Sequence, residues 1–310
     1  MVVATAPAKV ILLGEHAVVY GRPAIAAPVW AVYATAAISP RPPGAGCLLV
    51  AADLDRAYLL RDADDEDASA LVARATLGRL GLTADPDWRI ELRSTIPIAG
   101  GMGSGAALNA ALVRGLYAQA GQAVDPATVS ELVYLGEQRY HGTPSGIDNT
   151  VVAYGKPIWF VKGHAPEVFT LGAAFHLLIA DSGTPSPTKS TVAGVRLRRE
   201  ADPARFEMLF DAVGALVLDA RRALERGDAV SLGLLFNRNQ TLLVEIGVST
   251  PHLDALVAAA RAAGALGAKL SGGGGGGNVI ALVEEASAGA VQAALERAGA
   301  VRVLSTTVAA

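Results

Sequence analysis

The sequence predicts an α+β fold built from two domains. Segments with strand character and segments with helical periodicity interleave along the whole chain, without the regular strand–helix alternation of a parallel barrel. The chain has 310 residues, which exceeds the usual size of a domain with a single hydrophobic core. The pattern of its sequence changes between residues 162 and 172. We therefore expect one domain over residues 1–170 and a second over residues 171–310.

In the first domain, alternating and β-branched runs indicate strands, and runs of helix formers ended by glycine indicate helices. Strands are expected over residues 2–6, 9–13, 24–38, 47–51 and 88–94, with Pro7 parting the first two and Pro28 marking a bend or an edge. Helices are expected over residues 68–80, 106–120 and 127–141. Residues 14–21 and 142–149 are expected to form loops, and residues 151–154 and 158–161 a hairpin.

The second domain is expected to begin with a strand over residues 175–180 and a polar loop over residues 181–190. Helices over 203–226, 229–243 and 252–263 follow, then a hairpin of 268–270 with 278–283, a helix over 286–298 and a strand over 301–308. Six consecutive glycines, 272–277, join the hairpin strands. A flexible linker is one interpretation; a loop that lets another segment or a phosphate come close explains them better.

Composition excludes several classes of function. Hydrophobic residues make up 52% of the chain, and the net charge of −3 gives no electrostatic footprint for a nucleic acid or an anionic membrane. The cluster of Arg196, Arg198, Arg199 and Arg205 is interpreted as a solvated helix face. A single cysteine, Cys47, excludes an intramolecular disulfide. Without an apolar helix of spanning length or a signal peptide, we expect a soluble cytoplasmic protein.

A glycine loop between a predicted strand and a predicted helix is the first candidate site. It consists of Pro97, Ile98, Ala99, Gly100, Gly101, Met102, Gly103, Ser104, Gly105, Ala106 and Ala107. Glycines let consecutive backbone N–H groups approach a phosphate, and the helix N-terminus adds partial positive charge. By itself the loop is equally well explained as a tight turn that binds nothing.

Two known classes of phosphate loop fit this stretch poorly. A Walker loop needs a lysine and a hydroxyl after its last glycine, where this sequence has two alanines. A dinucleotide fingerprint survives in part, but the acid that follows it, Asp125, precedes a proline at a helix start instead of ending a strand. A nicotinamide-dependent enzyme is therefore the weaker alternative.

Lys9, Glu137 and Asp148 are candidate charged residues. A lysine in an apolar strand is costly unless an anion meets it, or unless it reaches solvent from an edge. The two carboxylates could divide the roles of holding Mg²⁺ and of binding a substrate hydroxyl, or they could be a solvated helix residue and a turn former. A phosphate loop, a lysine and two carboxylates are the parts that phosphoryl transfer needs.

Four motifs together resemble the GHMP kinase superfamily, and within it the mevalonate kinases. They are residues 6–21 (APAKVILLGEHAVVYG), the loop 97–107, residues 141–149 (HGTPSGIDN) and residues 269–277 (KLSGGGGGG). The similarity extends from about residue 2 to the C-terminus. Galactokinases continue GEH differently and homoserine kinases lack it, so the substrate assignment depends on residues 16–21.

The resemblance implies an N-terminal domain of the ribosomal protein S5 domain 2-like type, which binds ATP, and a ferredoxin-like C-terminal domain. It also implies ATP- and Mg²⁺-dependent phosphorylation of the 5-hydroxyl of mevalonate, in isoprenoid biosynthesis. Another kinase of the superfamily, such as phosphomevalonate kinase, is the alternative, and a homodimer is left open.

The resemblance also implies roles for individual residues. Asp148 would act as catalytic base or orienter and Lys9 would stabilise the transferring phosphoryl group. Glu137 and Ser104 would hold Mg²⁺, and the loop would hold the ATP phosphates. Glu15 and His16 would line the mevalonate site, with Lys189 meeting its carboxylate. In two places this chain departs from the family pattern: Gly105 replaces a second serine, and Gly273 replaces an alanine.

Overall fold

The computed structural model describes residues 1–97, 100–141, 144–186 and 188–309, and divides into two compact units. The first unit holds residues 1–9, 32–97 and 103–155, and the second holds residues 10–31, 98–102 and 156–310. Both units combine helices with strands, which confirms the predicted α+β class. The predicted boundary near residue 170 stays a prediction.

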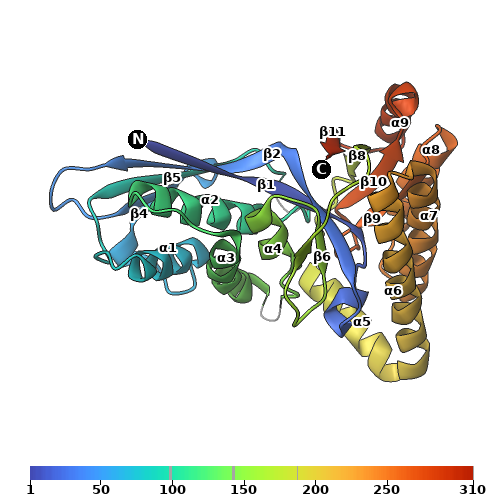
Figure 1. The fold of residues 1–310 in the computed structure, drawn as a ribbon, viewed down its shortest axis with the longest axis horizontal. Helices are drawn as coiled ribbons and strands as arrows, with labels where there is room; N and C mark the ends of the chain where they lie inside the picture. The colour runs from blue at the N-terminus through green and yellow to red at the C-terminus, as the bar shows by residue number, and fades with distance from the viewer. Residues whose placement is uncertain (98–99, 142–143, 187, 310) are drawn as a thin grey trace. The chain divides into compact units, whose positions relative to one another are not determined.

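In the first unit, helices pack along a sheet (Figure 1). Its strands are β1 (Val2–Leu13), β2 (Ala24–Pro40), β3 (Leu48–Ala51), β4 (Arg56–Leu59) and β5 (Trp88–Ser94), of which β1 and β2 continue into the second unit. Its helices are α1 (Ala68–Arg79), α2 (Ser104–Gln119), α3 (Pro126–His141) and α4 (Ile147–Tyr154), with short 3₁₀ turns η2 (Ala52–Leu54) and η3 (Leu60–Asp62). The strands pair in the order β4-β3-β5-β2, with β3 and β5 parallel.

Both N-terminal strands run through a proline, so the break predicted at Pro7 is wrong. In the described part of the chain β1 pairs only with β2. An edge strand tolerates proline, because the position of the missing N–H can face away from the neighbouring strand. Pro28 lies between residues 24–26 of β2, which pair with β6 (Ile158–Phe160), and residues 34–40, which pair with β5. Neither ladder therefore needs the missing N–H of Pro28.

Residues 147–154 form helix α4, so the loop predicted to extend to residue 149 and the strand predicted over 151–154 are wrong. Gly146, with φ 93°, precedes the helix and Gly155, with φ 62°, ends it. Glycine adopts this left-handed conformation without strain. Val151 and Val152 are buried where α4 packs against α2 and α3, so tertiary packing overrides their strand preference. As a result, Asp148 lies in the first turn of a helix.

The second unit contains a four-stranded antiparallel sheet in the order β11-β8-β10-β9. These strands are β8 (Phe175–Asp181), β9 (Gly267–Ser271), β10 (Asn278–Val283) and β11 (Arg302–Val308). Its other elements are η1 (Ala17–Tyr20), β6, β7 (Glu167–Val168), α5 (Thr188–Ala201), α6 (Pro203–Arg226), α7 (Ala229–Ile246), α8 (Pro251–Ala262) and α9 (Glu285–Arg297). Helices α7, α8 and α9 pack on the sheet, and α6 packs on α7 (Figure 1).

The polar segment that follows β8 is helical from Thr188, which corrects the loop predicted to extend to residue 190. Helix α5 has one buried side chain, Val195, among its described residues, so its sequence lacks an apolar stripe of helical period. Strand β4 is missed for a similar reason, because its side chains are exposed or half-buried. Among the described residues, no helix combines the length and the apolar character needed to cross a membrane.

Candidate active site

The N-terminus of α2 offers backbone N–H groups to a ligand. Gly103 caps the helix with φ 72° and makes no side-chain capping hydrogen bond, and Ser104 is the first helical residue. The first N–H groups of a helix have no partner within the helix and carry the positive end of its dipole. The position therefore suits an anion such as a phosphate.

Lys9 and Asp148 meet at this helix end. The Nζ of Lys9 lies 3.0 Å from Oδ1 of Asp148. A Cβ atom on Gly103 would lie 3.1 Å from Cγ of Lys9 and 3.9 Å from Oδ2 of Asp148. Glycine is thus required at residue 103 both for its torsion and for the close approach of the lysine. Three motifs far apart in the sequence meet at this point of the first unit.

Glu137, on α3, is the third charged residue of this cluster. It is buried; burial and, to a smaller extent, the charge of Asp148 raise the pKa of its carboxyl to about 8, against the opposing charge of Lys9. The two carboxylates therefore lie close enough to interact. No group of three or more histidine, cysteine, aspartate or glutamate side chains that could hold a metal is found in the described ranges.

The remaining residues of the predicted phosphate loop lie mostly inside the second unit or on α2. The carbonyl of Gly100 accepts a buried hydrogen bond from the Asn278 side chain. Gly101 has φ 73° and Met102 is buried. Ala106 and Ala107 are buried on the first turn of α2, which also contains Gly105. Predicted residues Ile98 and Ala99 lie outside the described residues.

In the second unit, Glu15 is fully enclosed. One carboxylate oxygen pairs with Nζ of Lys269, and the other accepts a hydrogen bond of 3.0 Å from Nδ2 of Asn239. Neither side chain of the ion pair is exposed to solvent. Burial lowers the pKa of Lys269, although Glu15 opposes this effect. Sequence reasoning gives Lys269 no role, but a lysine inside an apolar strand is the same signal that singled out Lys9.

His16 follows Glu15 in a strained backbone conformation, with φ 61°. Its Nε2 lies 2.9 Å from the carbonyl oxygen of Gly273. Because a carbonyl only accepts, Nε2 carries the hydrogen and Nδ1 keeps a free lone pair. Burial lowers the pKa of His16 to about 4, with Arg198 adding to the shift and the bond to Gly273 opposing it, so the ring is neutral near pH 7. Non-glycine residues with positive φ often lie at functional sites.

Lys189 lies in the first turn of α5 and is exposed. Its neighbour Thr188 packs against the glycine run, since a Cβ atom on Gly273 would lie 3.0 Å from Oγ1 of Thr188. A Cβ atom on Gly276 would lie 2.6 Å from the carbonyl oxygens of Thr184 and Pro185. The interpretation that these glycines admit another segment is confirmed.

The family of the chain follows from comparison with known proteins. Residues 68–156 match the GHMP kinases N terminal domain, and residues 220–301 match GHMP kinases C terminal. A mevalonate kinase of Thermococcus gammatolerans is 35% identical over 304 residues, which cover 92% of this chain and 90% of that protein. The crystal structure of L. major mevalonate kinase in complex with R-mevalonate matches with a TM-score of 0.85 and 28% identity, over 99% of this chain and 95% of that one.

A more distant structure has the same fold. The Streptococcus pneumoniae phosphomevalonate kinase in complex with phosphomevalonate and AMPPNP matches with a TM-score of 0.83, over 98% of this chain and all of that one. It is 17% identical, so this likeness concerns the fold alone. Because both domains of the family are matched and a relative is similar along nearly the whole chain, the protein belongs to the GHMP kinases.

Proposed function

We propose that this chain phosphorylates the 5-hydroxyl of (R)-mevalonate with ATP, giving 5-phosphomevalonate for isoprenoid biosynthesis in the cytoplasm. The meeting of Lys9 and Asp148 at the uncapped N-terminus of α2 carries the proposal. This arrangement combines a helix N-terminus that can bind phosphate, a cation and a carboxylate, which are the groups that phosphoryl transfer requires. The likeness to proteins named mevalonate kinase supports the choice of substrate.

In this proposal Asp148 accepts or orients the proton of the attacking hydroxyl. Its side chain is 30% exposed and can be reached by a substrate, whereas that of Lys9 is 4% exposed. The ammonium of Lys9 neutralises charge that develops on the attacking oxygen and on the transferred phosphoryl group. Since Lys9 also pairs with Asp148, it holds the aspartate side chain in place.

The ATP phosphates are expected at the N-terminus of α2, on backbone N–H groups of the loop from Gly100 to Gly105 and on the hydroxyl of Ser104. Glu137 and Ser104 are the residues that would hold Mg²⁺, which neutralises phosphate charge when bound. Carboxylate and hydroxyl oxygens are the hard donors that this ion prefers. Burial and the neighbouring charge of Asp148 raise the pKa of the Glu137 carboxyl, and a bound cation would offset both effects by favouring its ionised form.

Mevalonate is expected to contact residues of the second unit. With Nε2 bonded to Gly273, Nδ1 of His16 has a lone pair that can accept from a substrate hydroxyl, and the exposed ammonium of Lys189 suits a carboxylate. Both carboxylate oxygens of Glu15 already have partners inside the protein. We therefore assign Glu15 the task of fixing the backbone before His16, and a direct contact with substrate is not needed.

Release of ADP should be measured with mevalonate, phosphomevalonate, homoserine and galactose as separate acceptors. ADP release only with mevalonate, together with 5-phosphomevalonate as product, is the expected result. Preference for phosphomevalonate would replace the proposal with the alternative kinase. Binding of NAD(P)H without ADP release would instead favour the nicotinamide-dependent class.

A further inference from the structure

Helix α5 is held in the second unit by charged contacts. With one buried apolar side chain among its described residues, it cannot depend on hydrophobic packing. Arg198 donates from Nε and Nη2 to the carbonyl oxygens of Ile246 and Gly247, at 3.2 Å each. Arg199 is bound by Glu207 of α6, with Nε and Nη2 at 2.7 and 2.6 Å from Oε1. The position of α5 is therefore set by polar contacts near its C-terminal end.

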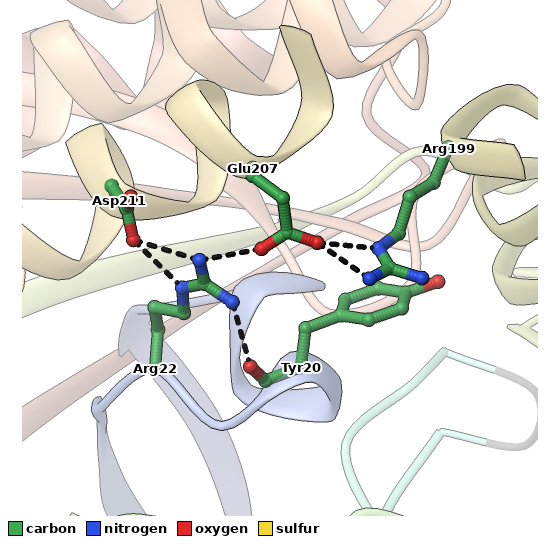
Figure 2. A network of polar contacts seen from close by, with 5 residues as sticks. All are labelled: Tyr20, Arg22, Arg199, Glu207 and Asp211. Atoms are coloured by element: carbon green, nitrogen blue, oxygen red, sulfur yellow. Dashed lines mark hydrogen bonds and ion pairs between the residues drawn. The ribbon is translucent and has the colours of Figure 1, made fainter. Parts of the chain in front are cut away.

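Glu207 connects this helix to the segment that carries His16 (Figure 2). Its second oxygen, Oε2, accepts a bond of 2.6 Å from Nη2 of Arg22. Arg22 in turn donates from Nη1 to the carbonyl oxygen of Tyr20, at 2.9 Å, and from Nε and Nη2 to Asp211. One carboxylate thus bridges two guanidinium groups, one on α5 and the other two residues after the end of η1.

The ring of Tyr20 provides a second connection between the same two segments. It stacks on Phe210 of α6, with centroids 4.5 Å apart and planes 12° from parallel. The guanidinium carbon of Arg199 lies 4.9 Å from the Tyr20 centroid, a cation–π contact (Figure 2). The ring of Tyr20 is therefore the group that contacts both α6 and α5.

The two ends of this arrangement carry the residues proposed to bind mevalonate. Lys189 lies in the first turn of α5, and His16 precedes η1, which ends at Tyr20. At this N-terminal end of α5, Gly273 contacts both segments: its carbonyl accepts a hydrogen bond from His16, and a Cβ atom on it would lie 3.0 Å from Oγ1 of Thr188. The loop 15–21 and α5 are therefore tied at Gly273 and again through Tyr20, Arg199 and Glu207.

We propose that Glu207 is a positioning residue, which fixes α5 against the loop 15–21 through Arg199, Arg22 and Tyr20. It thereby sets the spacing between Lys189 and His16 and selects a short acid that bears a hydroxyl. This inference depends on the proposed mevalonate site, but the network itself is a property of the second unit. Glu207 touches neither substrate nor ATP in this scheme.

The test compares Glu207→Gln with Glu225→Gln. Glu225 lies on the same helix and also pairs with an arginine, Arg221, at 2.9 Å, but it is outside the network. We expect Glu207→Gln to raise the KM for mevalonate about fivefold with the KM for ATP within about twofold, because two partly exposed ion pairs are weakened. Glu225→Gln should leave both values unchanged. Added KCl should raise the KM for mevalonate of the wild type more than that of Glu207→Gln.

Hydrogen–deuterium exchange gives a second readout that does not depend on the substrate. Amides of residues 188–201 should exchange about fivefold faster in Glu207→Gln than in Glu225→Gln, with α7 unchanged. Tyr20→Phe should behave like the wild type, whereas Tyr20→Leu should resemble Glu207→Gln. Unchanged exchange and an unchanged KM in Glu207→Gln would overturn the inference. If Glu207→Gln exchanged faster but the protein phosphorylated an acceptor other than mevalonate, the network would be supported and the proposed function would be wrong.

Discussion

The Nζ of Lys9 lies 3.0 Å from Oδ1 of Asp148, and the two side chains differ sharply in exposure, at 4% and 30%. The lysine is enclosed in the first unit, and the aspartate can be reached from outside. A partly exposed carboxylate held by a buried ammonium is oriented and accessible, as a base or an orienting group must be.

Replacing Asp148 with asparagine should abolish most turnover while ATP still binds. The amide keeps the shape of the side chain but loses its charge and basicity, which should lower kcat about 10²- to 10⁴-fold. Single-turnover kinetics and ATP titration measure the two effects. Asp219→Asn, at an exposed position on α6, is the matched control. Near-normal turnover in Asp148→Asn would remove Asp148 from the mechanism.

Lys9→Met should also lower kcat, about 10²- to 10³-fold, because the cation that neutralises the transferring group is lost. Methionine fills a similar volume, so the strand should persist. Steady-state kinetics at saturating ATP measure the loss, and thermal unfolding reports on stability. Lys156→Met, at an exposed position, should change neither property. If Lys9→Met changed only the unfolding temperature, Lys9 would be a structural residue.

The motifs of the proposed active site could be recognised in the sequence, because each needs a particular residue for a local reason. A positive φ and the close approach of Lys9 both require glycine at residue 103, so this residue of the motif can be recognised in the sequence. Glu137 and Asp148 are similarly singled out as carboxylates that flank a segment rich in glycine and proline. The roles of these residues stay predictions until turnover is measured.

What could not be predicted depends on tertiary contacts. Val151 and Val152 favour strands, but burial between helices makes α4 helical. The sequence of helix α5 lacks the apolar stripe of helical period from which a helix is usually predicted. The pairing of Arg199 with Glu207 joins two helices through charges that in the sequence resemble an ordinary solvated surface. Such pairs become visible only when the fold brings them together.

Lys269→Met should destabilise the second unit strongly. The substitution leaves the carboxylate of Glu15 buried without its cation, and breaking a buried pair in this way costs about 3–5 kcal/mol. Denaturant unfolding measures the loss. The double variant Glu15→Gln/Lys269→Met should recover much of it, because no unpaired charge remains. A loss equal in the single and double variants would mean that packing, and not charge, explains the effect.

Gly105→Ser tests whether the second hydroxyl of the family pattern matters here. Gly105 lies in the first turn of α2, next to Ser104, so a serine can add an oxygen near the expected phosphates. We expect the Mg²⁺ concentration for half-maximal rate to fall about threefold, as an added ligand or hydrogen bond of about 0.7 kcal/mol would produce. Gly105→Ala is the control, because it shares the gain in helix propensity but has no hydroxyl. Equal behaviour of the two variants would mean that Ser104 suffices.

The buried His16 predicts that stability falls in acid. Burial lowers its pKa from 6.5 to about 4 in the folded protein, so protonation favours the unfolded chain. The stabilising effect is complete above pH 6.5 and is lost as the pH falls toward 4, by up to about 3 kcal/mol. Glu137 acts in the opposite direction, because its raised pKa of about 8 costs stability as the pH rises from about 4.5 to 8.

The contribution of His16 is therefore isolated by comparing variants at each pH. His16→Asn keeps a residue that tolerates the positive φ but removes the titrating ring. Its unfolding free energy should vary less between pH 7 and pH 5 than that of the wild type, while His164→Asn, at an exposed position, should follow the wild type. If His16→Asn and the wild type lost stability in parallel, the pKa of His16 would be the same in the folded and the unfolded chain, and burial would not keep the ring neutral at pH 5. Protonation of the ring would then turn Nδ1 from an acceptor into a donor between pH 7 and pH 5, and binding of the substrate hydroxyl would weaken over the same range.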